Sequence, residues 1–297
     1  MGIVNIVRIM TPEQRQDLKL LLAQAGGMYE QRPSGASFRV KGEEWVVTSY
    51  NSGKVLFQGR RSDIPLAIAD QMQTSGVSAD EKMPLPVVGG DESGKGDLFG
   101  PLVVSAFAVR TPEERSAAVA AGARDCKLMS DGEVRTVAAR LKTIGMCEIV
   151  VLMPAQYNMR YRRAKNVNVL LNELYANLLL GLARKCDART VILDKYGNRA
   201  VSLWKEEQSF RFIVEERAER YLEVAAASVL ARNAFLDGLD RLAHENGLET
   251  LPKGSSAETQ AGLKRLVRQR GESILNYVAK THFAPVQACL NDLFEHH

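Results

Sequence analysis

The sequence has few of the residues on which many secreted proteins and enzymes depend. Its 297 residues include only four cysteines and four histidines. The cysteines are scattered and form no CxxC pair, which disfavours both a zinc site and a disulfide framework and predicts free thiols in a reducing compartment. His244 and His282 are isolated, and His296 and His297 end the chain. Histidine-centred catalysis therefore has little to draw on.

Long apolar runs are also lacking. No run reaches the roughly 18 residues of a membrane-spanning helix, and the N-terminus lacks the charged-then-apolar layout of a signal peptide. We therefore expect a cytoplasmic protein without a membrane partner. Hydrophobic residues make up 45% and charged residues 25%, as in ordinary globular proteins. The net charge of +4 permits a polyanionic partner without requiring one.

A segment without periodicity divides the chain in two. This segment, GVSADEKMPLP at 76–86, combines two prolines with small residues, which is typical of a linker. We predict a first domain at 1–78, a linker at 79–86 and a second domain at 87–297. At this length, two domains are as expected as one large one.

The first domain has the pattern of a small α+β unit. A strand at 4–9 precedes a helix that opens with Thr11-Pro12-Glu13-Gln14 and continues to about Ala25. Three β-rich runs follow (ASFRVK, EWVVTSY and GKVLFQG), with turns predicted at Lys41-Gly42 and Asn51-Ser52-Gly53. A second helix is predicted from Asp63 to Met72.

In the second domain, strands and helices alternate. The predicted strands are 86–92, 102–109, 147–153 and 189–197. The predicted helices are 112–121, 131–142, 167–185, 222–243, 257–269, 272–280 and 284–294. Two hairpin-like strands followed by strand–helix alternation predict a mixed α/β sheet flanked by helices, with a helical C-terminal tail.

The stretch GGDESGKGDLFGPLVVSAF, at 89–107, nearly spells a phosphate-binding P-loop. A true P-loop has Ser or Thr after its lysine and a helix behind it, whose N-terminal amides hold the phosphates. Here Gly96 follows Lys95, and the next regular element is the β-rich run LVVSAFAV. The sequence therefore excludes a P-loop.

Acidic residues stand at the ends of two apolar strands. Asp91 and Glu92 precede the turn 93–96, and carboxylates beside such a turn can bind divalent cations. Asp194 ends the strand Val191-Ile192-Leu193, and ligands gather at strand ends in α/β sheets. A third acidic stretch, 215–219, precedes the helix 222–243. The alternatives remain open: strand-capping acids, a turn aspartate and a solvated charged segment.

At these residues the chain resembles the type 2 ribonuclease H family, and within it the ribonuclease HIII branch. The stretch 89–107 is similar to the family's Asp-Glu-x-Gly-Lys-Gly strand and turn. RDCKLMSD (124–131) resembles its Asp-Ser-Lys motif, with Cys126 in place of the usual serine. VAAASVLAR (224–232) is similar to its Ala-Ala-Ser helix. YNSGKVLFQG (50–59) resembles the TATA-box-binding-protein-like N-terminal domain that distinguishes the HIII branch.

This resemblance implies a ribonuclease H-like catalytic domain behind a substrate-binding N-terminal domain, and a site of four carboxylates. Asp91, Glu92 and Asp194 match the family motif. The fourth acid is best matched by Glu219, although its spacing to the Ala-Ala-Ser helix is about one residue short, so Glu216 stays an alternative. The resemblance further implies substrate contacts from the turn and the following motif: Ser93, Gly94, Lys95, Gly96 and Lys127.

The function implied is endonucleolytic hydrolysis of the RNA strand of RNA–DNA hybrids. Two Mg²⁺ or Mn²⁺ ions would be held by the four acids, and the products would carry 5′-phosphate and 3′-hydroxyl ends. Part of the basic cluster 160–165 would hold phosphates, or be a solvated helix face. We expect a monomer without an obligate protein partner. The alternatives are cleavage at single embedded ribonucleotides, as in the HII branch, and hybrid binding without catalysis.

Overall fold

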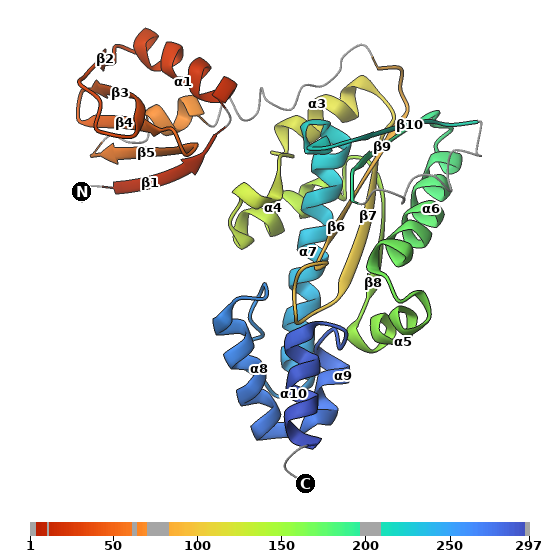
Figure 1. The fold of residues 1–297 in the computed structure, drawn as a ribbon. Coiled ribbons are helices and arrows are strands. Elements are labelled where there is room, and N and C mark those ends of the chain that lie inside the picture. The colour runs from red at the N-terminus through yellow and green to blue at the C-terminus, as the bar shows by residue number, and fades with distance from the viewer. Residues whose placement is uncertain (1–3, 11, 61–63, 70–82, 197–208, 295–297) are drawn as a thin grey trace. The chain divides into compact units, whose positions relative to one another are not determined.

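The computed structural model describes residues 4–10, 12–60, 64–69, 83–196 and 209–294 (Figure 1). It divides the chain into two compact units, Met1–Gly76 and Val77–His297. The first four residues of the predicted linker, 79–82, lie outside the described residues, as does the predicted N-cap Thr11. The assignment of the two predicted domains to substrate binding and catalysis remains a prediction.

The N-terminal unit is a five-stranded antiparallel sheet in the order β1-β5-β4-β3-β2. Its elements are β1 (Val4–Ile9), α1 (Pro12–Gln24), β2 (Met28–Tyr29), β3 (Ala36–Gly42), β4 (Trp45–Tyr50), β5 (Lys54–Gly59) and a helical turn at 64–69. The chain turns at the predicted Gly53, which has φ +89°. The other turn lies two residues later than predicted: Glu43 and Glu44 form it, and Glu44 takes the positive φ, 60°.

One face of this sheet is buried and the other is open. Along β3, buried Phe38 and Val40 alternate with the more exposed Arg39 and Lys41, as the two-residue period of a strand dictates. The buried side chains pack with Leu18 of α1 in a single apolar cluster. The opposite face therefore presents polar side chains of the central strands.

The second unit contains a mixed sheet in the order β10-β9-β6-β7-β8. The strands are β6 (Val87–Ser93), β7 (Leu102–Val109), β8 (Met146–Leu152), β9 (Thr190–Asp194) and β10 (Arg211–Glu215). β6, β9 and β10 run parallel, whereas β7 is antiparallel to both β6 and β8. The sheet confirms the predicted mixed α/β fold class.

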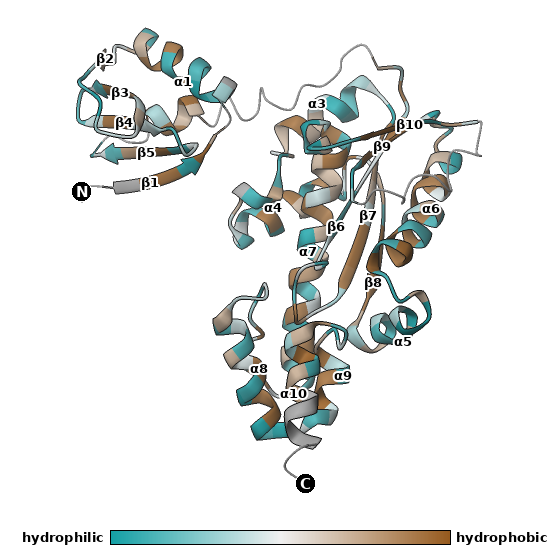
Figure 2. Ribbon diagram, viewed as in Figure 1, coloured by the Kyte–Doolittle hydropathy of each residue, from teal (hydrophilic) through white to brown (hydrophobic). Residues whose placement is uncertain are grey.

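Helices cover both faces of this sheet (Figure 1). The α-helices are α3 (Pro112–Ala120), α4 (Asp131–Leu141), α5 (Pro154–Ala164), α6 (Val167–Lys185), α7 (Leu222–Glu245), α8 (Ala257–Arg270), α9 (Leu275–Val278) and α10 (Ala284–Phe294). Short 3₁₀ turns lie at Cys126–Leu128, Ala218–Arg220 and Glu272–Ile274. Helices α3, α4 and α7 share one apolar cluster with β7, and α5 and α6 share another with its opposite face. Apolar residues concentrate accordingly on β7 and its flanking helices (Figure 2).

A pair of glycines lets β6 pass closely between these two layers. A Cβ on Gly89 would lie 2.4 Å from backbone atoms of Glu223 and Val224 in α7, and one on Gly90 would lie 2.8 Å from a methyl group of Leu179 in α6. Since real Cβ atoms do not approach other atoms this closely, Gly89 is required beside the backbone of α7, whereas a side chain at position 90 would displace the end of the Leu179 side chain. The tight packing fixes the strand that carries Asp91 and Glu92.

Two elements of the second unit differ from the sequence-based expectations. The segment 154–165 shows only a basic cluster in its sequence pattern, yet it forms α5 with a proline at its first turn. Its buried face is small and partly polar, with Tyr157 and Asn158, so it has little apolar periodicity. The edge strand β10 has no predicted counterpart either, although its sequence, RFIVE, contains the apolar run Phe212 to Val214. Among the described residues, no helix is long and apolar enough to span a bilayer.

Candidate active site

Asp91 lies near the end of β6 and is partly buried. Desolvation, together with the charges of Glu92 and Asp194, raises the pKa of Asp91 to about 7. Hydrogen bonds to the Ser228 side chain and to the Glu92 backbone N–H, which donates over 2.9 Å, oppose this shift. Ser228 Oγ also lies 3.1 Å from the Cys126 sulfur. A carboxylate in this setting is stabilised by a nearby cation.

Asp194 reaches the same edge of the sheet from β9. Because β9 runs parallel to β6 and Leu193 pairs with Gly90, Asp91 and Asp194 end neighbouring strands at the same level. Asp194 Oδ1 accepts a hydrogen bond of 3.1 Å from the backbone N–H of Ala218. The structure therefore brings together the two strand-end aspartates that the sequence singled out.

Glu92 is held by side chains of other elements. The hydroxyl of the buried Tyr175, in α6, donates a hydrogen bond to Glu92 Oε2. Lys95 Nζ lies 3.6 Å from Glu92 Oε1 and donates to the carbonyl of Tyr196 over 3.1 Å. The carboxylate is thus oriented by one neutral donor and one cation.

The charges of Glu219 and Asp91 both act on Lys127. The pKa of Lys127 is raised: desolvation opposes the shift, but the charges of Asp125, Glu219 and Asp91 outweigh it. The charges of Glu219 and Asp91 thus both favour the protonated form of Lys127. Glu219 stands in the 3₁₀ turn just before α7.

Glu216 points to a different place. Its side chain is 79% exposed and forms an ion pair of 3.2 Å with Lys195. Glu216 therefore has the surroundings of a surface acid, and the identity of the fourth acid remains a prediction.

The donor set fits a hard divalent cation. All four side chains offer carboxylate oxygens, the ligands that Mg²⁺ and Mn²⁺ prefer over sulfur or nitrogen. In the parts of the chain that the structure describes, no three acidic, histidine or cysteine side chains converge closely enough to enclose an ion. The fit thus rests on donor type and shared location.

The turn after β6 requires one of its two glycines for the fold. Gly94 has φ +86°, and a Cβ there would lie 2.1 Å from the carbonyl oxygen of Pro101. A Cβ on Gly96 would meet no atom within 4 Å. The space beside Gly96 is open, so packing does not require its lack of a side chain.

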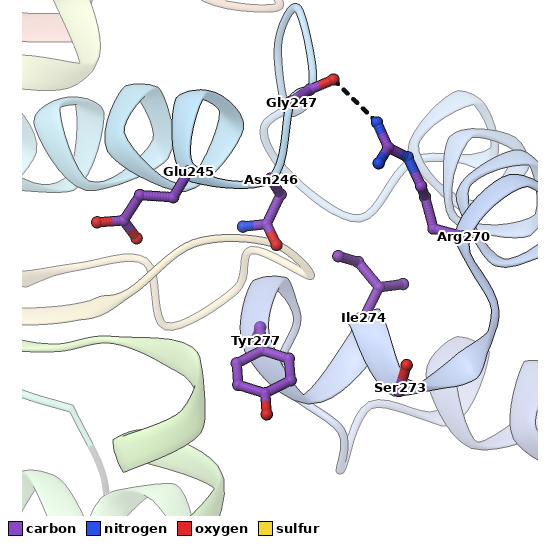
Figure 3. Close-up of a pocket in the computed structure, with 7 residues that line it drawn as sticks. All are labelled: Glu245, Asn246, Gly247, Arg270, Ser273, Ile274 and Tyr277. Carbon is purple, nitrogen blue, oxygen red and sulfur yellow. Dashed lines mark hydrogen bonds between the residues drawn. The ribbon is translucent and has the colours of Figure 1, made fainter.

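A separate pocket lies far along the chain from these residues (Figure 3). It is formed by the end of α7, the end of α8 and the segment leading into α9, and Arg270 there donates a hydrogen bond of 3.1 Å to the Gly247 carbonyl. Its lining residues all fall within 245–277, and none of the predicted site residues is among them. The candidate site is therefore the carboxylate edge of the sheet.

Two residues that contact the carboxylate site or the segment behind its turn are not among the sequence-based predictions. Tyr175 belongs to a predicted buried helix, and a tyrosine within a leucine-rich stripe signals a buried hydroxyl that needs a partner. Lys280 is fully buried behind the turn, and a lysine next to Val278 and Ala279 in the tail gives no such signal. Both contacts join segments far apart in the chain.

Comparison with known proteins identifies the chain as a nuclease of the ribonuclease H class, an endoribonuclease acting on RNA–DNA hybrids. The family model "Ribonuclease HII" matches residues 88–286, which span the whole sheet and its carboxylates. The chain belongs to the ribonuclease HII family. A second model, for a domain of unknown function, matches residues 5–68 of the N-terminal unit.

Curated relatives and solved structures point to the HIII branch. The chain is 35% identical over 266 residues to the ribonuclease HIII of Protochlamydia amoebophila, covering 87% of this chain and 88% of that protein. It is 29% identical to the ribonuclease HIII of Chlamydia pneumoniae, and the match covers 92% of this chain and 94% of that protein. The structure of Bst-RNase HIII in complex with Mn²⁺ is similar with a TM-score of 0.61, 30% identity and coverage of 97% and 98%. The structure of Aquifex aeolicus RNase H3 is also similar, with a TM-score of 0.57 and 26% identity, and the match covers 93% of this chain and 99% of that chain. The predicted resemblance to ribonuclease HIII is confirmed.

Proposed function

We propose that the chain cleaves the RNA strand of RNA–DNA hybrids by two-metal catalysis at the carboxylate edge, leaving 5′-phosphate and 3′-hydroxyl ends. The observation that carries this proposal is that Asp91 and Asp194 directly follow Gly90 and Leu193, which pair on parallel strands, and that desolvation and acidic neighbours raise the pKa of Asp91 to about 7. Carboxylate oxygens are the ligands that hard divalent cations prefer.

Asp91, Glu92, Asp194 and Glu219 would hold two ions, Mg²⁺ or Mn²⁺. When bound, the ions would supply activation of the attacking water and stabilisation of the leaving oxygen. Asp91 would be one of these ligands together with Glu92 and Asp194, whose charges both raise its pKa. Tyr175 holds the Glu92 carboxylate in place through its hydrogen bond.

The remaining site residues would bind the hybrid. The turn from Ser93 to Gly96 follows the first acid pair directly, so its backbone would meet the ribose whose 2′-hydroxyl distinguishes RNA from DNA. Lys127, on which the charges of Asp91 and Glu219 act, would contact a phosphate. Lys95, now paired with Glu92, would contact another.

The N-terminal unit would add a sequence-independent grip on the hybrid. The open face of its sheet carries Arg39 and Lys41, and a shallow pocket on this unit is lined by both, together with Trp45 and Gln58. Cations on an open sheet face suit a phosphate backbone, and binding of this kind weakens as salt is added. We further propose that the protein acts as a monomer in the cytoplasm, which is consistent with its four free cysteines.

We expect the two glycines of the turn to respond differently to alanine. In Gly96→Ala, the new methyl group meets open space in the protein but blocks the approach of the ribose, so hybrid binding weakens by about tenfold while the melting temperature is unchanged. Gly94 has a positive φ, and an alanine Cβ there would clash with the carbonyl oxygen of Pro101, so Gly94→Ala should lose at least about 1 kcal/mol of stability. Hybrid affinity and thermal melting of both variants measure this.

Gly181→Ala is the matched control, because Gly181 of α6 also has open space around it and is distant from the turn in sequence. It should retain full hybrid affinity. Wild-type affinity in Gly96→Ala would show that substrate does not approach the turn at that position.

The identity of the fourth acid gives a second expectation. Glu219→Gln should slow cleavage by roughly a hundredfold, about 2.7 kcal/mol of transition-state stabilisation, and raise the metal concentration needed for half-maximal rate. Glu216→Gln, which removes a solvated ion pair, should cleave like the wild type. Rates measured over a Mg²⁺ titration decide the point, and the reverse ranking would transfer the role to Glu216.

The experiment that tests the proposed function compares substrates and product ends. Strand-labelled hybrids with a long RNA tract, and DNA duplexes containing one embedded ribonucleotide, are incubated with Mg²⁺ or Mn²⁺. We expect cuts within the RNA tract, with 3′-hydroxyl ends that a polymerase can extend, and weak or no cleavage at the single ribonucleotide. Preferential cleavage at the single ribonucleotide would instead establish the HII-like alternative.

A further inference from the structure

Lys280 is a fully buried lysine that follows α9, with none of its surface exposed. Its ammonium donates hydrogen bonds to the backbone carbonyls of Asp97 at 3.0 Å, Phe99 at 3.4 Å and Gly100 at 2.8 Å. Its backbone N–H donates to the carbonyl of Leu98 at 2.9 Å. One residue therefore satisfies four consecutive carbonyl groups, from 97 to 100.

The rest of this segment is also attached to the C-terminal region. The N–H of Gly100 donates to the carbonyl of Val278 over 3.0 Å, and that of Leu98 donates to the carbonyl of Gly254, also over 3.0 Å. The N–H of Gly254 donates in turn to the Asp97 carboxylate over 2.6 Å. Segment 97–100 is thus positioned by residues of the distant C-terminal region.

This segment determines where the substrate-binding turn lies. The backbone of Gly94 packs against the carbonyl oxygen of Pro101, since even a Cβ there would approach it to 2.1 Å. The N–H of Asp97 closes the turn on the carbonyl of Gly94 over 3.4 Å. A shift of segment 97–100 would therefore carry the Gly94–Gly96 turn with it.

The chemistry of this position calls for a lysine. An ammonium group has three N–H donors and no acceptor, which matches three carbonyl oxygens. Burial lowers the pKa of Lys280 to about 7, against the opposing effect of Asp97, so the carbonyl groups offset a real cost of desolvation. The face of the buried Tyr157 ring, 5.8 Å from Nζ, adds a further favourable contact.

We propose that Lys280 is a positioning residue for ribose recognition: it fixes segment 97–100 and, through Gly94, the turn that contacts the 2′-hydroxyl. This inference rests on the proposed function of the turn. It assigns to the C-terminal tail a part in telling RNA from DNA, although Lys280 itself touches no substrate. The four carboxylates lie on β6, β9 and the turn before α7, and Lys280 hydrogen-bonds to none of them, so its replacement removes no metal ligand.

The test measures discrimination between ribose and deoxyribose in the full-length protein. Affinities for a fluorescent RNA–DNA hybrid and for a DNA duplex of the same sequence are measured with Ca²⁺ in place of Mg²⁺, and their ratio is compared among wild type, Lys280→Met and Leu275→Ala. Leu275 is comparably buried in the same tail. We expect both variants to melt earlier, but only Lys280→Met to lose about tenfold of the ratio.

Mn²⁺ affinity, measured by calorimetry, should stay at the wild-type value in Lys280→Met. Should that variant fail to fold, Lys280→Gln, which keeps an amide donor, gives the same comparison. A wild-type ratio in the Lys280 variant, or an equal loss in Leu275→Ala, would overturn the positioning role alone. Equal affinity of the wild type for both duplexes would overturn recognition of the ribose by the turn, and the inference with it.

Discussion

The Asp91→Asn variant is expected to lose hybrid cleavage by roughly a thousandfold or more, about 4 kcal/mol of transition-state stabilisation, and yet to be more stable than the wild type without metal. The two effects have one cause. The buried carboxylate that would bind the ions is also one that the fold destabilises, because desolvation and acidic neighbours raise its pKa to about 7.

The sign of the stability effect follows from proton binding. Between its unfolded pKa of 3.8 and its folded pKa of about 7, Asp91 holds a proton in the folded protein that the unfolded chain has lost. The free energy of unfolding of the metal-free wild type therefore falls as the pH rises through this window. Asparagine does not titrate, so at about pH 8 the variant should gain roughly 1–3 kcal/mol. This advantage should vanish as the pH falls toward the unfolded pKa.

Thermal melting in EDTA at about pH 5 and about pH 8, on either side of the folded pKa, measures this effect, beside cleavage rates in Mg²⁺. Asp240→Asn is the matched control, because Asp240 is 72% exposed and paired with Arg135, and its replacement should change neither stability nor rate appreciably. A cleaving Asp91→Asn variant, or one that is less stable at the higher pH, would contradict the role assigned to Asp91.

The Glu223→Gln variant should show the opposite behaviour. Glu223 is buried in the first turn of α7 and forms an ion pair of 2.8 Å with Arg115 of α3, whose side chain is itself only 11% exposed. Removing one charge from a buried pair leaves the other uncompensated, which costs about 3–5 kcal/mol and lowers the melting temperature by roughly 2–4 °C per kcal/mol. Below that temperature, cleavage should persist, because Glu223 pairs with Arg115 rather than with the carboxylate edge.

A double variant, Glu223→Leu with Arg115→Met, separates charge from packing. Since replacing both members of a buried pair by apolar residues is often nearly neutral, this variant should recover a large part of the lost stability. Melting of Glu223→Leu, Arg115→Met and the double variant, compared with the wild type, gives the coupling energy of the pair. Additive losses would mean that the ion pair contributes little beyond packing.

Asp91 and Glu92 could be predicted from sequence because they interrupt apolar strands that alternation and β-branched residues define. Asp194 could be predicted for the same reason, and strand ends in an α/β sheet are known to converge. The same reasoning predicts β7, α6 and α7 closely, since their apolar patterns are long. Helix α5 has little apolar surface and therefore no such pattern, whereas β10 is a short edge strand whose apolar run, Phe212 to Val214, spans only three residues.

The contacts that orient the site were beyond sequence reasoning. Tyr175 and Glu92 are 83 residues apart in the chain, and Lys280 lies 180 residues from the Gly100 carbonyl that it binds. Such pairs follow from the packing of α6 and of the C-terminal tail against the sheet, which no local pattern encodes. The choice between Glu219 and Glu216 likewise required the side-chain environment, because the two acids are close in sequence and have very different surroundings.

If the carboxylate edge makes this chain a metal-dependent nuclease of hybrids, cleavage of a hybrid requires an added divalent cation, and a cleavage assay of the metal-free protein tests this. Wild-type protein freed of metal with EDTA is supplied with Mg²⁺ or Mn²⁺ and a hybrid labelled on each strand, beside RNA and DNA duplexes of the same sequence. We predict that only the RNA strand of the hybrid is cleaved, that the RNA and DNA duplexes stay intact, and that cleavage occurs only with metal. Hybrid binding without cleavage at any metal concentration would contradict this prediction and establish a non-catalytic binding protein.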